Sequence, residues 1–492
     1  MPKIKITEND YTGRINSTAI THTVYVPCKG ENNVAAEPEL FTSVSKFEAS
    51  GKYSVDTLSY KLIKRLLNLG LYVLAEAVKV ESGKPVSNTK TDTIDWARLE
   101  DKSLYDIRFL TTGEFACPTG DMCGCAQRRG DCVALLDHPE SLTAGTYEGA
   151  FAYKLLEVAP GDWSVNYDKY YVINYVQLSG TEAPKFEVGK YYEYAEADDV
   201  YVLLDAKPET WDIGYTSYYM IGSPAYKLNS SSEFKANKFY AKQDELNVVE
   251  SVRTYFQSVS GSADDSFSAA FTPWFKSQNA DLGGSSLVPA SIPAAFGYLF
   301  AYARSIARNP EWYAVAGSFR GNIAELNDVH YIYTAAEIEM LQARSAEEAV
   351  ELDAEGDNIG FAINPISYVR PFGYIIWGNR TLIPNAGSTK STSFLNVRNL
   401  VSSIKKSLYN AARKFTFEQN NDVLWVNFKS QITPLLDKMQ SGNGIVGYKF
   451  TRLETDAKAR LKARLTIIPI EAVEDFELEI ELADSISTTE TI

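Results

Sequence analysis

The first part of the chain combines a strand-like pattern with a helix-like one. His22, Val24 and Val26 alternate with other residues, as in a strand. Between residues 55 and 69 apolar side chains recur at steps of three and four, and Gly70 follows at the position of a helix C-cap. The members of this repeat are Val55, Leu58, Leu62, Leu66 and Leu69. The pattern predicts a strand and then an amphipathic helix.

Three apolar runs follow, and each is typical of a buried strand. They are LYVLAEAVKV (71–80), YDIRFLTTG (105–113) and DCVALLDHP (131–139). A short helical segment, AQRRG (126–130), precedes the third run. Strands that are apolar on both faces and alternate with helices indicate an α/β arrangement with a mostly parallel sheet.

Residues 143–250 have a different character. Short runs such as YYVINYVQL and DDVYVLLD are separated by Gly, Pro and Asp, and the segment holds 15 of the 31 tyrosines. This pattern predicts a β-rich insertion into the α/β part. Tyrosine is common on half-buried strands, which explains the enrichment. The alternative is an aromatic binding surface, such as a platform for carbohydrate.

The rest of the chain returns to mixed helices and strands. Residues 334–351 are helical in pattern, residues 361–382 alternate strand-like runs with Pro and Gly, and two amphipathic helices are predicted over 394–415 and 422–440. Near the end, FELEIEL (476–482) alternates strictly between apolar and acidic residues. Its apolar face consists of Phe476, Leu478, Ile480 and Leu482. We expect this segment to be an amphipathic strand.

Composition excludes several classes of protein. The 492 residues suggest roughly three domains. With 48 basic and 63 acidic residues the net charge is −15, which disfavours direct binding to nucleic acid. No apolar stretch approaches the roughly 18 residues of a membrane span, and the N-terminal residues have no apolar signal region. We therefore expect a protein without stable membrane insertion.

The five cysteines are few and odd in number, which indicates a reducing compartment rather than a disulfide scaffold. Four of them, Cys117, Cys123, Cys125 and Cys132, are spaced C-x5-C-x-C-x6-C, with His138 nearby. They are weak candidates for a zinc site, because this spacing matches none of the usual paired patterns. Buried thiols are the favoured interpretation.

Signatures of catalysis are scarce. The chain has only three histidines, and it contains neither a metalloprotease pair nor a phosphate-binding loop. Gly442, Gly444 and Gly447 satisfy G-x-G-x-x-G, but a predicted helix precedes them and a predicted strand follows, which is the reverse of a dinucleotide site. A glycine turn is the better interpretation. No catalytic residue and no cofactor are predicted.

The predicted helix over 394–415 reverses the charge of the chain locally. It carries five cations and no acid, whereas residues 470–492 carry eight acids and no base. The cations are Arg398, Lys405, Lys406, Arg413 and Lys414. Such a helix offers a docking surface for an acidic partner.

Six motifs follow one another in the second half of the chain. They are FSAAFTPWF (267–275), LVPASIPAAFGYLFAYARSIARNPEWYAVAG (287–317), INPI (363–366), GYIIWGNRTL (373–382), FLNVRNLVSSIKKSL (394–408) and FTFEQNNDVLWVNFKSQITPLL (415–436). In these motifs and in their order, the chain resembles the tail sheath proteins of contractile phages and related injection machines. The sequence departs from the family in its cysteine-bearing loop (117–125) and in AVAG, where an Ala-Pro pair is more common.

The resemblance implies an α/β and α+β multidomain protein, with an α/β sheath core, an inserted β-rich domain and a C-terminal α/β domain with extended terminal arms. The expected parts are an N-terminal arm (1–26), the core (27–142 and 251–358), the inserted outer domain (143–250), the inner-layer C-terminal domain (359–484) and a tail (485–492).

The resemblance further implies a structural subunit of a helical sleeve. Sheath subunits surround a tail tube, and the sleeve shortens to drive the tube through a cell envelope without nucleotide hydrolysis. Expected partners are many copies of the chain, the tube protein, and baseplate and tail terminator proteins, in a virion assembled in the bacterial cytoplasm. Members of the family lend terminal arms to neighbours by strand addition, and both 476–482 and the strand-like start at 1–26 fit that role.

Within this resemblance, the C-terminal domain lies beside the tube. We therefore expect Arg398, Lys405, Lys406, Arg413 or Lys414 to contact an acidic tube surface or a neighbour's acidic C-terminal arm. Two other functions stay open: a baseplate or other tail component of the same machine, and a carbohydrate-active enzyme that uses the tyrosine-rich insertion. Phage tails, bacteriocin-like particles and other injection systems are not separated by the sequence.

Overall fold

The computed structural model describes residues 22–143, 248–342, 362–383 and 391–472, with gaps at 82–83, 91–92, 116–118, 260–265 and 456–458. Outside these ranges it describes the strands β1, β2 and β9–β15. None of the described helices is both long and apolar enough to cross a bilayer.

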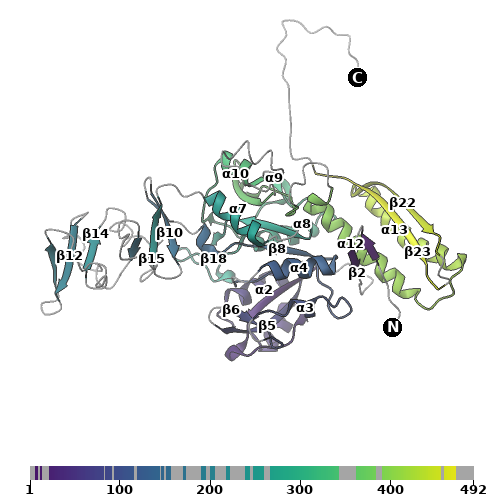
Figure 1. The fold of residues 1–492 in the computed structure, drawn as a ribbon, viewed down its shortest axis with the longest axis horizontal. Helices are drawn as coiled ribbons and strands as arrows, with labels where there is room; N and C mark the ends of the chain where they lie inside the picture. Colours follow the sequence, from purple (N-terminus) through teal and green to yellow (C-terminus); the bar gives the residue numbers. More distant parts are fainter. Residues whose placement is uncertain are drawn as a thin grey trace, which may run out of the picture.

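A nine-stranded mixed sheet forms the core of the molecule (Figure 1). Its strand order is β21-β20-β16-β8-β7-β3-β5-β4, and β6 also pairs with β5. The strands from β5 to β20 pair in parallel, whereas β4, β6 and β21 are antiparallel to their neighbours. The bounds are β3 Thr23–Lys29, β4 Glu39–Phe41, β5 Tyr72–Glu81, β6 Lys84–Val86, β7 Phe109–Leu110, β8 Val133–Leu136, β16 Ser268–Thr272, β20 Asn364–Val369 and β21 Gly373–Ile376. The prediction of a mixed α/β structure with a mostly parallel sheet is confirmed.

Helices cover both faces of this sheet, as the runs of buried residues predict. In β3, Val24 and Val26 face one apolar cluster while Tyr25 faces the other. The first cluster is closed by α1 Val44–Ser50, α2 Leu58–Asn68 and α8 Ala294–Ile306. The second is closed by α3 Trp96–Leu99, α4 Thr119–Arg129, α7 Val248–Val259 and α10 Ala335–Gln342. Residues 23–26, which the prediction assigned to an N-terminal arm, thus belong to the middle of the sheet.

The helix predicted from the repeat over residues 55–69 is α2. Its first amides are satisfied by two side chains, because Thr57 accepts from the Tyr60 amide and Glu114 accepts from the Leu58 amide at 2.7 Å. Gly70, with φ of +87°, ends the helix as predicted. The run 105–113 is less regular than predicted, since only Phe109 and Leu110 pair as a strand.

The strands between β8 and α7 form two antiparallel sheets that do not pair with the core sheet. One has the order β11-β15-β10-β9 and the other β13-β12-β14. Their bounds are β9 Thr146–Glu148, β10 Phe151–Leu156, β11 Tyr170–Val172, β12 Lys190–Ala195, β13 Val200–Leu204, β14 Tyr218–Ile221 and β15 Phe239–Gln243. Figure 1 shows these sheets at one end of the molecule, with the core between them and the C-terminal elements.

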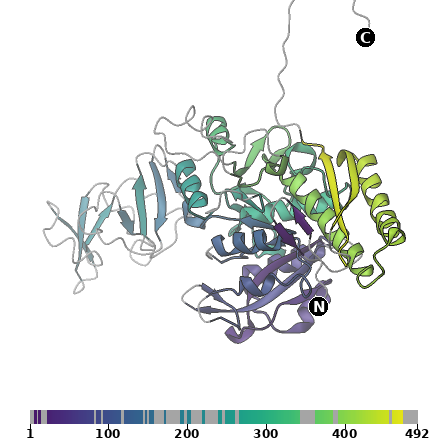
Figure 2. The same cartoon turned by 45° about the vertical axis from the view of Figure 1, so that its right-hand side comes forward.

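A C-terminal unit, residues 391–472, packs two helices against a hairpin around its own apolar cluster (Figure 2). The elements are α12 Leu395–Lys414, α13 Asp422–Ser441, β22 Ile445–Leu453 and β23 Lys462–Pro469. Both predicted amphipathic helices are present within a few residues of their predicted bounds. Three smaller pieces complete the fold: a sheet of β17 Phe275–Ser277, β18 Ala290–Ile292 and β19 Asp328–Val329, the short helix α9 Gly317–Arg320, and a hairpin of β1 Ile6–Glu8 and β2 Tyr11–Gly13.

Candidate functional site

The helix α12, which carries the five predicted interface cations, lies between the core and the rest of the C-terminal unit. Leu400 and Ile404 pack into the C-terminal cluster, while Leu395 joins the core. Side chains are therefore buried on more than one face of the helix. Arg413 and Lys414 occupy its last turn, where positive side chains interact favourably with the negative end of the helix dipole.

Three of the five cations point into the protein rather than toward a partner. Arg398 is 2%, Lys405 8% and Lys406 1% exposed. Lys406 Nζ lies 2.6 Å from Asp106 Oδ1 and donates to the carbonyl of Ile107. In this conformation these three side chains are therefore not available to a tube or a neighbour, and the predicted contact is left to Arg413 or Lys414. A buried ammonium or guanidinium must be hydrogen-bonded, and the core supplies the acceptors.

The other two buried cations are held in the same way. Lys405 Nζ donates to the carbonyl of Gly130 at 2.9 Å. Arg398 donates to Ser266 Oγ at 2.8 Å, and its guanidinium lies over the Phe267 ring, 4.2 Å from the centroid. Each contact joins α12 to a core segment far away in sequence.

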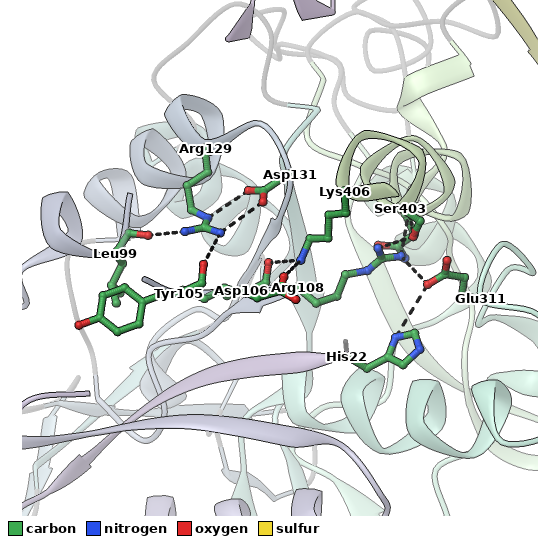
Figure 3. Close-up of polar contacts among 12 residues, drawn as sticks. His22, Leu99, Tyr105, Asp106, Arg108, Arg129, Asp131, Glu311, Ser403 and Lys406 are labelled. Carbon is green, nitrogen blue, oxygen red and sulfur yellow. Dashed lines mark hydrogen bonds and ion pairs between the residues drawn. The ribbon is translucent and has the colours of Figure 1, made fainter. Parts of the chain in front are cut away.

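A fully buried arginine of the core completes this junction (Figure 3). Arg108 donates to Ser403 Oγ at 2.6 Å and to the carbonyl of Asn399 at 2.9 Å, both on α12. Its guanidinium also lies 3.3 Å from a carboxylate oxygen of Glu311. Arg108 of the core thus binds α12, and three cations of α12 bind the core in return. We call Asp106, Arg108, Glu311, Ser403 and Lys406 the polar junction.

His22 lies at the edge of the polar junction. Its Nδ1 is 2.9 Å from the hydroxyl of Tyr302 and 3.8 Å from Glu311. Burial lowers the pKa of His22 to about 4, and the nearby Arg108 acts in the same direction, while Glu311 opposes them. The imidazole is therefore neutral at pH 7, and it holds the N-terminal segment to the core through a hydrogen bond.

A second buried pair lies on the other side of Figure 3. Arg129, at the end of α4, pairs with Asp131 at 3.1 Å and donates to the carbonyls of Leu99 and Tyr105. Burial lowers the pKa of the neighbouring Lys102 to about 8, although Asp131 opposes the shift. This pair ties α3 and α4 together and has a structural role.

The glycine motif has a packing role. Trp312, from the core, donates its indole N–H to the carbonyl of Gly442 at 2.7 Å. A Cβ on Gly442 or Gly444 would lie 2.7 or 2.9 Å from the indole ring. Gly442 and Gly444 therefore lie in a turn between α13 and β22, as the helix-then-strand order predicted, and they leave room for the indole ring of Trp312.

The cysteines are placed as small buried residues. Cys123 and Cys125 on α4 and Cys132 before β8 are buried, and Cys117 lies outside the described residues. Burial raises the pKa of Cys132 to about 11, so its thiol stays protonated at pH 7. Within the described ranges, no group of three or more potential ligands could hold a metal ion.

Sequence reasoning missed one further polar pair. Ser291 Oγ lies 2.8 Å from His330 Nε2, a contact that hydrolases use to activate serine. Glu140, however, approaches the same nitrogen at 4.0 Å instead of the other side of the ring. The amide of Ala295, near the start of α8, is bound to Asp137 at 2.8 Å. Glu140 therefore does not complete a Ser-His-acid triad with this pair.

Exposed cations occur elsewhere in the C-terminal unit. Arg413 and Lys414 at the end of α12 are exposed, so their interface role stays a prediction. The hairpin β22–β23 adds Lys449, Lys462 and Arg464 on its outer face, and none of the three forms an ion pair within the part of the chain that the structure describes. The predicted strand with Phe476, Leu478, Ile480 and Leu482 lies outside the described residues.

Comparison with known proteins identifies the relatives of this fold. Residues 388–483 match the family model of the phage tail sheath C-terminal domain. No curated protein matches the chain in sequence. Among solved structures, the chain is similar to an extracellular contractile injection system, the PVC sheath complex in the contracted state, with 14% identity, 98% of each chain covered and a TM-score of 0.53.

Two structures of the anti-feeding prophage (AFP) are also similar. One is its helical sheath in the contracted state, with 12% identity, 98% of each chain covered and a TM-score of 0.50. The other is its six-fold symmetrised baseplate, with 13% identity, coverage of 98% of this chain and 99% of that chain, and a TM-score of 0.50. The chain therefore shares the fold of contractile injection system sheath proteins, and its C-terminal part matches the phage tail sheath C-terminal domain.

Proposed function

We propose that this protein is the structural subunit of a contractile sheath. Many copies assemble as a helical sleeve around a tail tube, and the sleeve contracts to drive the tube through a cell envelope. The work comes from interfaces that repack between two assembled states, so the role is mechanical and not catalytic.

The observation that carries this proposal is the fold, which nearly the whole chain shares with two sheaths in the contracted state, one of them described as helical. The match of residues 388–483 to a sheath domain supports it. Partners then follow from the role: further copies of the chain, a tube protein, a baseplate and a tail terminator. The expected location is the tail of a virion or an injection particle. Genes for a capsid and a terminase beside this one would indicate a phage.

The test is assembly of the purified full chain, alone and co-expressed with the tube protein encoded beside it. We expect striated hollow tubes by negative-stain electron microscopy. Failure to form open tubes in both samples would contradict the proposal.

A baseplate component is the second candidate, because one of the similar structures is described as a baseplate. This candidate predicts a closed ring of fixed copy number, whereas a sheath subunit forms open tubes of variable length. The same micrographs distinguish the two, since a closed ring does not elongate when the protein concentration is raised.

We further propose that the acidic segment after β23 adds to the β22–β23 hairpin of a neighbouring copy. The register places Lys449, Lys462 and Arg464 on the outer face of the hairpin, while Phe450 and Leu465 face the apolar cluster. A strand with the pattern of 476–482 would place its apolar side chains over the cluster and its glutamates over the cations. Both faces are thus complementary.

A charge swap tests this arm. Lys462→Glu with Arg464→Glu should raise the protein concentration needed for tubes, because like charges then face each other. Adding Glu479→Lys and Glu481→Lys should restore assembly. No effect of the first pair at low salt would contradict this placement of the arm.

We propose that Arg413 and Lys414 contact the tube or a neighbour. They are the two exposed members of the original five cations. Arg413→Glu with Lys414→Glu should weaken co-assembly with the tube at low salt, and Lys46→Glu with Lys90→Glu, two exposed lysines of the core, is the matched control. If the two double variants weakened co-assembly equally, the end of α12 would have no specific role in contacting the tube.

A further inference from the structure

A short loop joins α12 to α13, and apolar side chains are exposed around it. Phe417, in the loop, is 87% exposed. Val423 and Val426 lie one turn apart near the start of α13, and they are 64% and 61% exposed. Arg413 and Lys414, in the last turn of α12, are exposed directly before the loop. We call these five residues the tip of the C-terminal unit.

The backbone of Phe417 is strained. Its φ of +77° lies in the left-handed region, which a bulky side chain rarely adopts. Among the described residues, the other non-glycine positions with positive φ are asparagines, which tolerate this region.

Hydrogen bonds beside Phe417 hold the loop in place. Asn421 caps α13 by accepting from the amide of Leu424 at 2.9 Å. Asn420 donates to the carbonyl of Arg460 at 3.2 Å. A strained backbone that the surrounding structure maintains at an exposed aromatic residue is typical of a functional site.

The chemistry of the tip requires a partner that is both apolar and acidic. Interfaces often depend on an aromatic anchor, and cations at the rim select a partner of opposite charge. Neither Arg413 nor Lys414 forms an ion pair within the ranges that the structure describes. Because the net charge of the chain is −15, other copies of the chain present acidic surface to the tip.

One surface of the core has the matching chemistry. Residues 328–342, which include α10, contain three acids and no lysine or arginine. Ile332 is 64% exposed, and Asp328 and Glu339 are exposed as well. The surface therefore offers an apolar side chain and carboxylates to the apolar side chains and cations of the tip. Phe417 does not lie on this surface in its own subunit, since its ring is exposed.

We propose that the tip docks on residues 328–342 of another copy of the chain, with Phe417 as the anchor. This inference rests on the proposed sheath function, because it names the partner for the end of α12. The contact joins two different surfaces of the chain and is therefore heterologous, and heterologous contacts repeat along open helical assemblies.

Photo-crosslinking of the full chain identifies the partner. A benzophenone amino acid replaces Phe417, and the protein is irradiated alone and after co-expression with the tube protein encoded beside it. We expect an adduct of twice the chain mass in both samples, with the linked peptide inside residues 328–342. The absence of this adduct, an adduct with the tube protein in its place, or a link to another part of the chain would overturn the proposal.

A substitution separates the anchor from the fold. Phe417→Asn removes the ring and supplies a residue that tolerates a φ of +77°. Its melting temperature should equal or exceed that of the original protein, while the protein concentration at which tubes appear, measured by light scattering, should rise by about tenfold or more.

The control is Phe319→Asn in α9 of the core, because the ring of Phe319 is 91% exposed as well. Its tube onset should stay unchanged. A lower melting temperature of Phe417→Asn would show that the ring serves folding, and an unchanged tube onset or an equal shift in the control would also overturn the proposal.

The failures of the two proposals are distinguishable. If the adduct with a second copy forms but no open tubes appear in either sample, the sheath function is wrong and the contact holds. If tubes form without that adduct, the sheath function holds and the contact is wrong.

Discussion

At the scale of single residues, the cations of α12 show that the partners of a charged side chain depend on tertiary structure. The sequence predicted the helix correctly, because its apolar stripe is periodic. It also suggested that the cations face a partner, since no acid lies on the helix itself. The partner of Lys406 is Asp106, 300 residues earlier in the chain. No local pattern reveals such a distant contact, although a charged Asp-Arg pair within the apolar run 105–113 was an available signal.

The polar junction predicts a large effect for Arg108. Arg108→Met leaves Glu311 buried without its guanidinium partner, so we expect the free energy of unfolding to fall by about 3–5 kcal/mol. Urea denaturation followed by circular dichroism measures this change. The control is Arg128→Met in the half-exposed Arg128–Glu100 pair, where the loss should stay within about 1 kcal/mol. Similar losses at the two sites would contradict the structural role of the junction.

The glycines around Trp312 predict a position-specific effect. Gly444→Ala places a methyl group against the indole ring, and we expect a loss of about 1–3 kcal/mol from the resulting overpacking. Gly447→Ala is the matched control, because no atom lies within 4 Å of its added Cβ. Thermal unfolding of both variants decides the point. Equal losses in the two variants would show that the contact with Trp312 is not what requires glycine at position 444.

At the scale of elements, helix boundaries depend on side chains that the sequence places far apart. α8 follows Pro293 and has no cap from its own N-terminal residues. Asp137, at the end of β8, accepts the amide of Ala295 instead. Sequence periodicity predicts that such a helix exists but cannot assign a cap 158 residues away. In the same way it predicted α12 and α13, but not that the polar side of α12 is covered by the core.

The cap on α8 makes stability depend on pH. Burial raises the pKa of Asp137 to about 7, against the opposing effect of the Ala294 and Ala295 amides. The folded protein therefore keeps this proton longer than the unfolded chain. The contribution of Asp137 is fully present below pH 3.8 and is lost as pH rises toward 7.

Asp137→Asn removes this titration while it keeps an acceptor for the helix. Relative to the variant, the original protein should lose stability between pH 4 and pH 7, by at most about 1.4 kcal/mol per pH unit. Urea denaturation of both proteins across this range measures the difference, which cancels the titration of His22 and other shared groups. A constant difference would show that Asp137 has an unshifted pKa.

At the scale of the whole molecule, α12 makes the core and the C-terminal unit mechanically continuous. Its apolar side chains Leu400 and Ile404 belong to the C-terminal cluster, whereas Leu395 and the polar side chains Ser403 and Lys406 contact the core. Trp312, which follows α8 of the core, makes a further connection by donating its indole N–H to the carbonyl of Gly442 in the C-terminal unit. A force applied to either unit is therefore transmitted to the other through buried contacts rather than through a flexible linker.

Because of this continuity, we expect the core and the C-terminal unit to unfold together. Ile404→Ala, at a side chain that is 4% exposed, should cost about 2–5 kcal/mol and lower hydrogen-exchange protection in α13 and α8 together. Val426→Ala on α13, at a side chain that is 61% exposed, should change neither. Loss of protection confined to α13 would show that the two units unfold separately.

The two sheets formed by β9–β15 leave and rejoin the core at neighbouring places, because η2 (Glu140–Leu142), just before β9, lies against α7, just after β15. A foreign domain whose own termini lie close together could therefore be inserted at this point without separating the elements of the core. In the proposed sheath, the inserted domains would then be displayed at a regular spacing, with one attachment point for every subunit.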